Sequence, residues 1–184
     1  RRDLKKPAAE IKEFYSRPGS LVFFFDEGRF GLQPTLGRLW ASIGERQVIK
    51  VRTSYQNFYI YASVSPLTGE SFMLILPWVN TEMMNLYLGQ LALTFPLKNI
   101  LLIMDQAGWH KAKDLRYSPQ ITIKYLPPYS PELNPVEKLW QHLGRHVCRN
   151  KCYQTEKEYV VALEQEIQSL SPSKLLSLCH CNYL

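Results

Sequence analysis

LVFFFDEGRFGL, residues 21–32, is the strongest strand signal in this chain. The apolar side chains of residues 21–25 alternate between the two faces of an extended chain, so both faces are apolar. A strand of this kind belongs inside a sheet that is covered on both sides. The stretch therefore predicts a central strand whose apolar run ends at Asp26.

The other expected strands fall into two groups. Between residues 47 and 77, alternation of apolar and polar side chains predicts two or three strands in an antiparallel meander, including 58–65 and 72–76. After them, the run ILLIM at 100–104 predicts a second strand that is apolar on both faces, and 121–126 predicts a shorter one.

Helices are expected mainly in the second half of the chain. The first begins after an N-cap at Asn80 or Thr81, and its apolar stripe is Met84, Leu88, Leu91 and Phe95. The second begins at Pro135, and its stripe is Val136, Trp140, Leu143 and Val147. The third follows the capping box of Thr155 and Glu158, and its stripe is Val160, Leu163, Ile167 and Leu170. A last short helix begins at Ser171. This order of elements predicts one mixed α/β domain over residues 20–184, with helices on both faces of the sheet. The basic residues 1–19 are expected to form a linker or arm.

Composition limits the class of protein. With 46% hydrophobic and 21% charged residues, the chain is not of a disordered or low-complexity type. Its longest apolar runs are far shorter than the roughly 20 residues of a membrane span, so no membrane partner is expected. The formal net charge of +6 suits a polyanion such as nucleic acid.

The four cysteines all lie in the C-terminal fifth of the chain: Cys148, Cys152, Cys179 and Cys181. Two of them are separated by a single residue, which is too close for the usual zinc-ligand pair. We therefore expect reduced thiols. A zinc cluster that also uses His142 and His146 is the alternative.

Two aspartates occupy equivalent places. Asp26 follows LVFFF and Asp105 follows ILLIM. An ionised carboxylate at the end of a buried strand is costly unless it is paired or binds a cation. If the two strands are neighbours, the carboxylates converge, and a divalent cation removes their repulsion. Oxygen ligands of this type favour Mg²⁺ or Mn²⁺, although each aspartate could also simply cap a turn.

A third carboxylate for such a site comes from LPPYSPELNPVEKLW, residues 126–140. Glu132 lies in its proline-rich part. Glu137 lies in the first turn of the expected helix, where it flanks the buried stripe and can point to the sheet edge. An acid in this position is also favoured by the helix dipole alone, so the residues leave both explanations open.

Three blocks of this sequence together resemble the DDE transposase superfamily. They are DEGRFGL at 26–32, MDQAGWHKA at 104–112 and LPPYSPELNPVEKLW at 126–140, and the nearest branch is the bacterial insertion-sequence transposases related to mariner. The resemblance covers roughly residues 20–150. It implies a ribonuclease H-like fold, two Mg²⁺ (or Mn²⁺) ions, and a catalytic, metal-binding triad of acids. Matched block by block, these acids are Asp26, Asp105 and Glu137.

The chain departs from the family pattern at two points. Gln106 stands where the family commonly has Asn, which keeps the amide but lengthens the arm. The family also places a helix-turn-helix DNA-binding region before the catalytic domain, and residues 1–19 leave no room for one. We therefore expect a catalytic domain separated from its DNA-reading region.

Basic side chains are candidates for contact with DNA. Lys138, His142, Arg145 and Arg149 would form one stripe of a helix, which is also the pattern of a solvated helix face. Arg29, His110 and Lys111 follow the first two acids, where a scissile phosphate would arrive. The aromatic residues Trp40, Tyr55, Tyr59 and Tyr61 are expected to be packing residues.

These observations predict a Mg²⁺-dependent DDE endonuclease and DNA strand transferase, that is, the catalytic domain of a transposase. Expected partners are double-stranded DNA, at the element ends and the target, and a second copy of the chain in a homodimer on DNA. The expected location is the bacterial cytoplasm, on the nucleoid. The alternatives are a truncated or domesticated remnant that binds DNA without cutting it, and another ribonuclease H-like nuclease.

Overall fold

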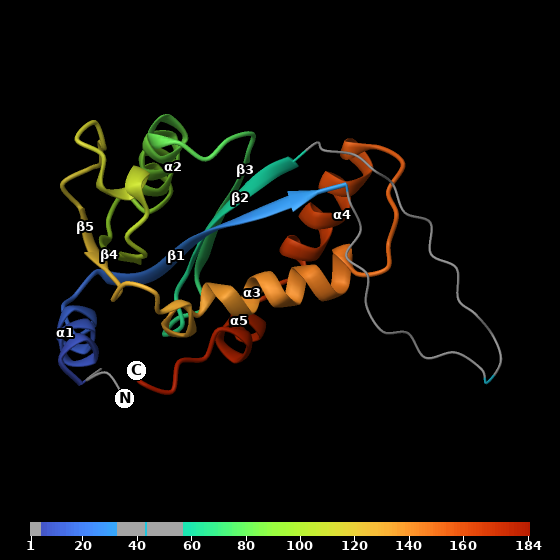
Figure 1. Ribbon diagram of the computed structural model, residues 1–184. Helices are drawn as coiled ribbons and strands as arrows, with labels where there is room; N and C mark the ends of the chain where they lie inside the picture. The colour runs from blue at the N-terminus through green and yellow to red at the C-terminus, as the bar shows by residue number, and fades with distance from the viewer. Residues whose placement is uncertain (1–4, 33–42, 44–56) are drawn as a thin grey trace.

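The computed structural model describes residues 5–32, 43 and 57–184 (Figure 1). Its elements in chain order are α1 (Lys5–Tyr15), β1 (Ser20–Gly31), β2 (Asn57–Val64), β3 (Ser71–Leu76), α2 (Thr81–Thr94), β4 (Asn99–Met104), the 3₁₀ turn η1 (Gly108–Lys111), β5 (Ile121–Tyr125), the 3₁₀ turn η2 (Pro131–Leu133), α3 (Val136–Leu143), the π-helical turn η3 (Gly144–Cys148), α4 (Glu156–Gln168) and α5 (Pro172–Leu178). Trp40, Tyr55 and any strand within 47–56 lie outside the described residues.

The sheet has five strands in the order β3-β2-β1-β4-β5. β1, β2 and β3 are antiparallel neighbours, which confirms the predicted meander. β4 and β5 then add to the other side of β1 in parallel with it. The result is a mixed sheet of the ribonuclease H-like type, with β1 at its centre.

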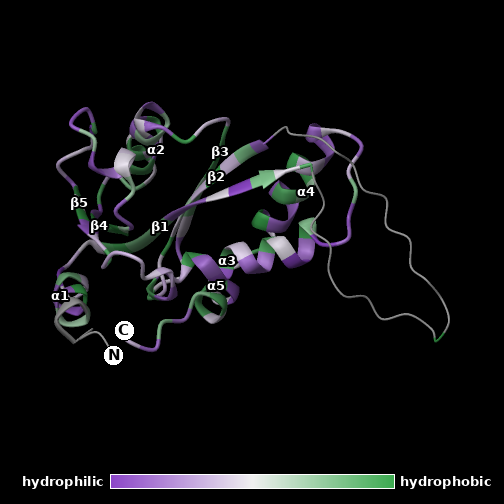
Figure 2. Cartoon of the chain, viewed as in Figure 1, coloured by the Kyte–Doolittle hydropathy of each residue, from purple (hydrophilic) through white to green (hydrophobic). Residues whose placement is uncertain are grey.

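β1 extends further than its apolar run predicted. It pairs with β4 from Ser20 to Phe24 and with β2 from Phe24 to Gly31. Asp26 therefore lies within the strand rather than at its end, at the place where the neighbouring β4 stops. Figure 2 shows the change along β1 from hydrophobic to hydrophilic colour.

Helices cover both faces of the sheet, as predicted. One core contains Val22 and Phe24 of β1 together with residues of α1, α3, α4 and α5, and the other contains Phe23 and Phe25 together with residues of α2. These β1 side chains are fully buried, and each contributes roughly 1.5–3 kcal/mol to stability. The two cores fix which face of the sheet every later residue of β1 occupies.

Local signals place most helix starts correctly. Asn80 caps α2 by accepting a hydrogen bond from the Met83 backbone N–H at 2.8 Å, and Thr155 caps α4 by accepting one from Glu158 at 3.1 Å. In α3 the prediction was wrong at one position. Leu139 fills the core with Val136 and Leu143, whereas Trp140 is only half-buried at the edge of that core.

The N-terminal segment is not a free arm. Residues 5–15 form α1, and its Ala8 and Ile11 are buried in the first core. Glu10 of this helix forms an ion pair with Lys124 of β5. The expected boundary near residue 19 therefore does not separate α1 from the sheet. None of the helices in the described part of the chain is long and apolar enough to span a bilayer.

Candidate active site

The strand register brings the two aspartates together. Phe24 of β1 pairs with Ile103 of β4, and Asp26 and Asp105 each follow two residues later. Because side chains alternate along a strand, Asp26 projects from the same face as Phe24, the face that packs against α3, while Asp105 is the first residue after β4. The alignment of two parallel strands thus produces an acidic edge at the point where β4 ends.

Glu137 reaches this edge because Asn134 fixes the start of α3. The Asn134 side chain donates a hydrogen bond from Nδ2 to the backbone oxygen of Phe25 at 2.9 Å, and its Oδ1 accepts one from the Val136 N–H at 3.2 Å. Asn134 is 6% exposed, so both bonds are shielded from water. Sequence reasoning missed this residue, because nothing in the pattern around it indicates a partner more than a hundred residues away.

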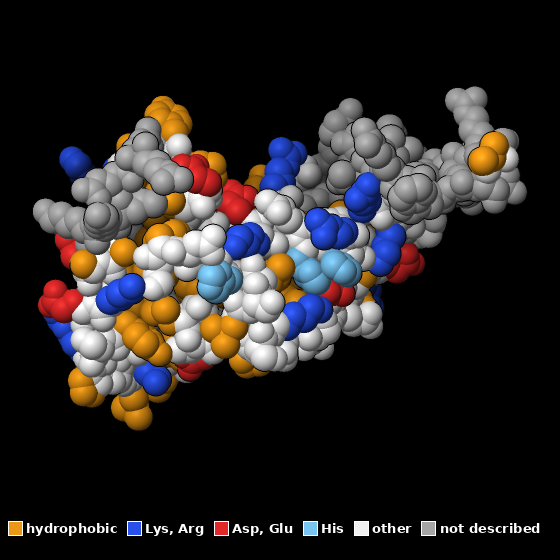
Figure 3. Space-filling model, turned by 90° about the horizontal axis from the view of Figure 1, so that it is seen from below, with side chains coloured by type: hydrophobic (Ala, Val, Ile, Leu, Met, Phe, Trp, Pro, Cys, Tyr) orange, Lys and Arg blue, Asp and Glu red, His pale blue; other side chains and the backbone are white. Residues whose placement is uncertain are grey.

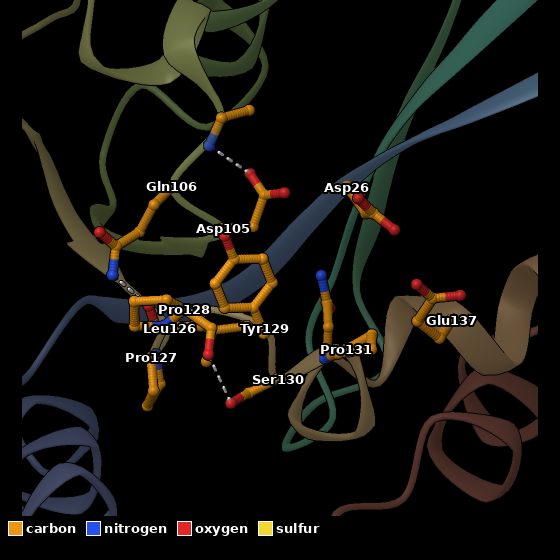
Figure 4. Close-up of a pocket in the computed structure, with 12 residues that line it drawn as sticks. Asp26, Asp105, Gln106, Leu126, Pro127, Pro128, Tyr129, Ser130, Pro131 and Glu137 are labelled. Atoms are coloured by element: carbon orange, nitrogen blue, oxygen red, sulfur yellow. Dashed lines mark hydrogen bonds between the residues drawn. The ribbon is translucent and has the colours of Figure 1, made fainter.

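The three acids line one cavity of about 410 Å³ (Figure 4). Asp26 comes from β1, Asp105 follows β4, and Glu137 comes from α3; the proline-rich loop 127–131 forms the opposite wall. Glu132 does not line this cavity; it borders another one near the C-terminus, which Glu137 also lines. The geometry thus favours Glu137 over Glu132 as the third acid.

Of the three acids, Asp26 has the most strongly raised pKa. Burial raises the pKa of its carboxyl group, and repulsion from Glu27 and Glu137 adds to the rise, so that the pKa reaches about 7. The hydrogen bond from the Trp140 indole Nε1 to Asp26 Oδ2, at 2.8 Å, lowers the pKa but does not compensate. Burial also raises the pKa of Glu137.

The surroundings of Asp105, in contrast, favour its ionised form. His110 Nδ1 lies 2.7 Å from Asp105 Oδ1, and the Ala107 backbone N–H donates to the same oxygen at 3.0 Å. The hydrogen bond from His110 lowers the pKa of Asp105, with a smaller contribution from Ala107, against the effect of burial. Asp105 is therefore an ionised carboxylate of fixed orientation, and its side chain is still 57% exposed toward the cavity.

His110 does not occupy the place expected of a DNA contact. Its side chain is 1% exposed and lies between two carboxylates, with Nε2 2.9 Å from Glu27 Oε1. The Trp109 indole donates to that same oxygen at 3.0 Å. Burial lowers the pKa of His110, but the hydrogen bonds to Asp105 and Glu27 outweigh it and raise the pKa to about 9. His110 is thus a buried cation that supports Asp105.

Glu27 is the second residue that sequence reasoning missed. Because side chains alternate along β1, Glu27 lies on the sheet face opposite Asp26, and it does not line the acidic cavity. That face, however, is also the one that η1 covers, and η1 carries His110 and Trp109. Glu27 is therefore connected to the acidic cavity indirectly: it bonds His110, which in turn bonds Asp105.

Two of the predicted phosphate contacts lie at the surface near the acids. Arg29 is exposed and borders a second, wider cavity of about 690 Å³ that shares Asp26 and Glu137 with the first. Lys111 is exposed, donates to Gln106 Oε1, and lies 5.0 Å from the centre of the Tyr125 ring. Gln106 also donates to the Leu126 backbone oxygen at 2.9 Å, so its longer amide arm braces the proline-rich loop.

The predicted basic stripe is interrupted. Lys138 and Arg145 are exposed, and Arg149 is half-buried. His142, between them, is directed to Glu166 of α4, with Nε2 2.7 Å from Oε1. Lys138 donates to the backbone oxygen of His180. Three permanent positive charges remain on this side of α3 and η3, but they do not form a continuous face.

Gly28 permits the contact between Trp140 and Asp26. A Cβ atom at Gly28 would lie 2.9 Å from the Trp140 ring and 2.8 Å from the Phe30 ring. We expect Gly28→Ala to displace the indole and to lower stability by about 1–3 kcal/mol. Urea unfolding would measure the loss. Gly89→Ala is the matched control, since a Cβ there meets nothing within 4 Å; equal behaviour of the two variants would contradict the prediction.

A five-stranded mixed sheet in this order, with helices on both faces, defines a ribonuclease H-like fold. Residues 21–159 match the model of the DDE superfamily endonucleases, and the chain belongs to this family. Both results confirm the family and the fold that the sequence predicted.

Two bacterial proteins are similar in sequence to this chain, and one of them comes from an insertion element. It is 37% identical over 103 residues to the protein y4pE/y4sA of Sinorhizobium fredii, a match that covers 55% of this chain and 76% of the relative. It is 26% identical over 156 residues to the 39 kDa protein of insertion element IS630 from Shigella sonnei, covering 82% of this chain. The match spans only 46% of the IS630 protein.

Solved structures of the Mos1 mariner transposase share the fold. The Mos1 paired-end complex with the left transposon end gives a TM-score of 0.69 at 14% identity, covering 94% of this chain and 56% of the Mos1 chain. The Mos1 paired-end complex with Mg gives 0.71 at 13% identity, covering 95% and 56%.

Proposed function

We propose that this chain catalyses divalent-metal-dependent cleavage of a DNA strand and its transfer to a target strand, as the catalytic part of an insertion-element transposase. The observation that carries this proposal is the convergence of Asp26, Asp105 and Glu137 on one cavity. Membership of the DDE superfamily endonucleases supports it independently.

The chemistry of the three side chains fits a cation. All of them are carboxylates, the preferred donors for Mg²⁺ and Mn²⁺. Burial and mutual repulsion raise the pKa of Asp26 and disfavour its anion, and a divalent cation would reverse both effects. We propose that Asp26, Asp105 and Glu137 together hold two Mg²⁺ or Mn²⁺ ions. Ions bound there would supply an activated nucleophile and charge stabilisation at the phosphate.

The surrounding residues would orient these ligands. Trp140 holds one oxygen of Asp26, while the Ala107 N–H and His110 hold one oxygen of Asp105. Each aspartate thus keeps its second oxygen available to a ligand in the cavity. Asn134 sets the position of Glu137 through the start of α3. Rotamers fixed in this way reduce the reorganisation that the reaction would require.

The proposed partners follow from the same reasoning. The substrate would be double-stranded DNA at the element ends and the target, with its phosphates bound by Arg29, Lys111, Lys138, Arg145 and Arg149. Two copies of the chain would act together on DNA as a homodimer, and the reaction would take place on the nucleoid of a bacterial cell. The paired-end complexes of Mos1 are the basis for proposing two copies.

A nicking assay tests the proposed activity. Plasmid DNA carrying the element ends would be incubated with the chain and Mg²⁺, and we expect nicks that EDTA abolishes. Asp105→Asn keeps the shape of the side chain but removes its charge, and it should abolish nicking without loss of folding. DNA binding with no nicking under any metal condition would instead favour the remnant that binds without cutting. Nicking that Asp105→Asn leaves intact would refute the site.

The salt dependence of DNA binding tests the basic residues. Each phosphate that is neutralised contributes about −0.9 to the slope of log affinity against log salt, so Lys138, Arg145 and Arg149 would together give about −2.7. Replacing Lys138 and Arg145 by glutamine should reduce the magnitude of the slope by about 2. Lys12→Gln, on an exposed position of α1, is the control. An unchanged slope in the double variant would remove these residues from the interface.

A further inference from the structure

Outside the acidic cavity, His142 of α3, His146 of η3 and Glu166 of α4 form a compact cluster. Among the described residues these are the side chains whose ligand atoms, one from each residue, all lie within 4.8 Å of one another. The two imidazole rings are 4.0 Å apart between centroids and tilted by 30° to each other. Figure 3 shows a neighbouring pair of histidine side chains at the surface, with an acidic side chain beside them and basic side chains around them.

A hydrogen bond to the backbone fixes the tautomer of His146 that can bind a metal ion through Nε2. Its Nδ1 lies 2.9 Å from the backbone oxygen of His142, so this nitrogen carries the proton and donates, and Nε2 is left as an acceptor. Metal-binding histidines typically have one ring nitrogen fixed in this way by a carbonyl. The π-helical turn η3 begins directly after α3 and carries His146. Such turns often occur at functional sites.

Glu166 provides the negative charge. Its Oε1 lies 2.7 Å from His142 Nε2. Burial opposes ionisation of Glu166, but the hydrogen bond from His142 outweighs it and lowers the pKa of the carboxyl group. Besides His142, Lys174 lies in ion-pair range of Glu166, at 3.8 Å, and its side chain is 44% exposed.

We propose that His142, His146 and Glu166 form a binding site for Zn²⁺, separate from the acidic cavity. Two imidazoles and one carboxylate are a donor set typical of zinc and unfavourable for Mg²⁺, which prefers oxygen ligands alone. The ion would take the place of the proton shared by His142 and Glu166. Three protein ligands leave a fourth tetrahedral position, which water would fill because His146 is exposed.

Zinc at this site would join α3 to α4. His142 lies on the helix whose first turn carries Glu137, His146 lies in the π-helical turn that follows it, and Glu166 lies on the helix packed beside it. Binding that occurs only in the folded state stabilises that state by mass action. The expected result is a thermal unfolding midpoint that rises with zinc concentration.

Calorimetric titration of the full chain with ZnCl₂, in excess Mg²⁺ to occupy the acidic cavity, tests the proposal. We expect one zinc ion per chain, and an affinity at least about tenfold weaker in Glu166→Gln and in His146→Ala. Asp26→Asn should bind zinc as the wild type does. His180→Ala should also do so, and it is the matched control because His180 is exposed between Cys179 and Cys181.

Three results would overturn the proposal. They are no uptake of zinc by the folded wild-type chain, an affinity that His146→Ala leaves unchanged, and loss of binding in His180→Ala with retention in His146→Ala, which would assign the ion to the cysteines. His146 has an exposed side chain, so its replacement is expected to leave the fold intact, and circular dichroism would verify this. The titration needs no DNA, so its outcome is independent of the proposed strand transfer.

Discussion

Glu137→Gln is expected to lower the rate of Mg²⁺-dependent DNA nicking by about 10³-fold or more, because the loss of one ligand charge removes several kcal/mol of transition-state stabilisation. Glu132→Gln, five residues earlier in the same motif, should retain most of the activity. Glu132 is exposed and does not line the cavity that contains Asp26 and Asp105, whereas Glu137 does. Single-turnover nicking of a plasmid that carries the element ends would measure both rates.

The comparison of these two variants is informative because both remove one negative charge from the same segment. Any general effect of charge on DNA binding should therefore be shared, and only a specific role of Glu137 separates the rates. Glu137→Gln also relieves the repulsion that raises the pKa of Asp26, so the variant should fold at least as well as the wild type. Equal losses in the two variants would show that the third acid is wrongly assigned.

Much of the fold follows from the sequence because its signals are local. Runs that are apolar on both faces identified β1 and β4 as central strands, and the switch to helical spacing identified α2 and α3. The two aspartates could be paired in advance because each follows such a run. The position of Asp26 inside β1 was not predicted, since β2 rather than β4 supports the second half of the strand. That pairing depends on a partner strand and not on the composition of β1 itself.

The parts of the site that were not predicted depend on contacts between distant residues. Glu27 and His110 are separated by more than eighty positions, and only the packing of η1 against β1 brings them together. Trp140 was assigned to the core because helical spacing places it near the buried face. Spacing does not reveal that Gly28 leaves room for the indole to bond Asp26.

The basic stripe shows the limit of regular periodicity. The prediction assumed a uniform helix through residues 138–149, but α3 ends at Leu143 and a π-helical turn follows. The wider turn changes the direction of the side chains that come after it. In addition, an acid on α4 pairs with His142. The spacing of residues along one helix predicts neither the π-helical turn nor the pairing of His142 with an acid on another helix.

His110→Gln is expected to be the most destabilising of the substitutions considered, by about 3 kcal/mol near neutral pH. The change removes a buried cation from between Glu27 and Asp105 and leaves Glu27, whose side chain is 7% exposed, with Trp109 as its remaining partner. Removal of one member of a buried ion pair typically costs about 3–5 kcal/mol. Urea unfolding in EDTA, which keeps the acidic cavity free of metal, would measure the loss.

The size of this loss should depend on pH in a defined direction. The pKa of His110 is raised from an ordinary value of 6.5 to about 9 in the folded chain, so its extra stabilisation is complete below pH 6.5 and disappears as the pH rises through about 9. Asp105 remains ionised throughout, because its pKa is lowered. The difference between wild type and His110→Gln should therefore shrink from about 3 kcal/mol at about pH 6 to about 1 kcal/mol at about pH 10, where only a neutral hydrogen bond is lost.

His180→Gln is the matched control for this measurement, since it replaces an exposed histidine by the same residue. A difference for His110→Gln that stays constant between the two pH values would mean that His110 is neutral in the folded protein. In that case Asp105 would not be held by a cation from behind, and its orientation would depend on the Ala107 N–H alone. A difference that grows with pH would reverse the sign of the linkage and contradict the charge assigned to this buried group.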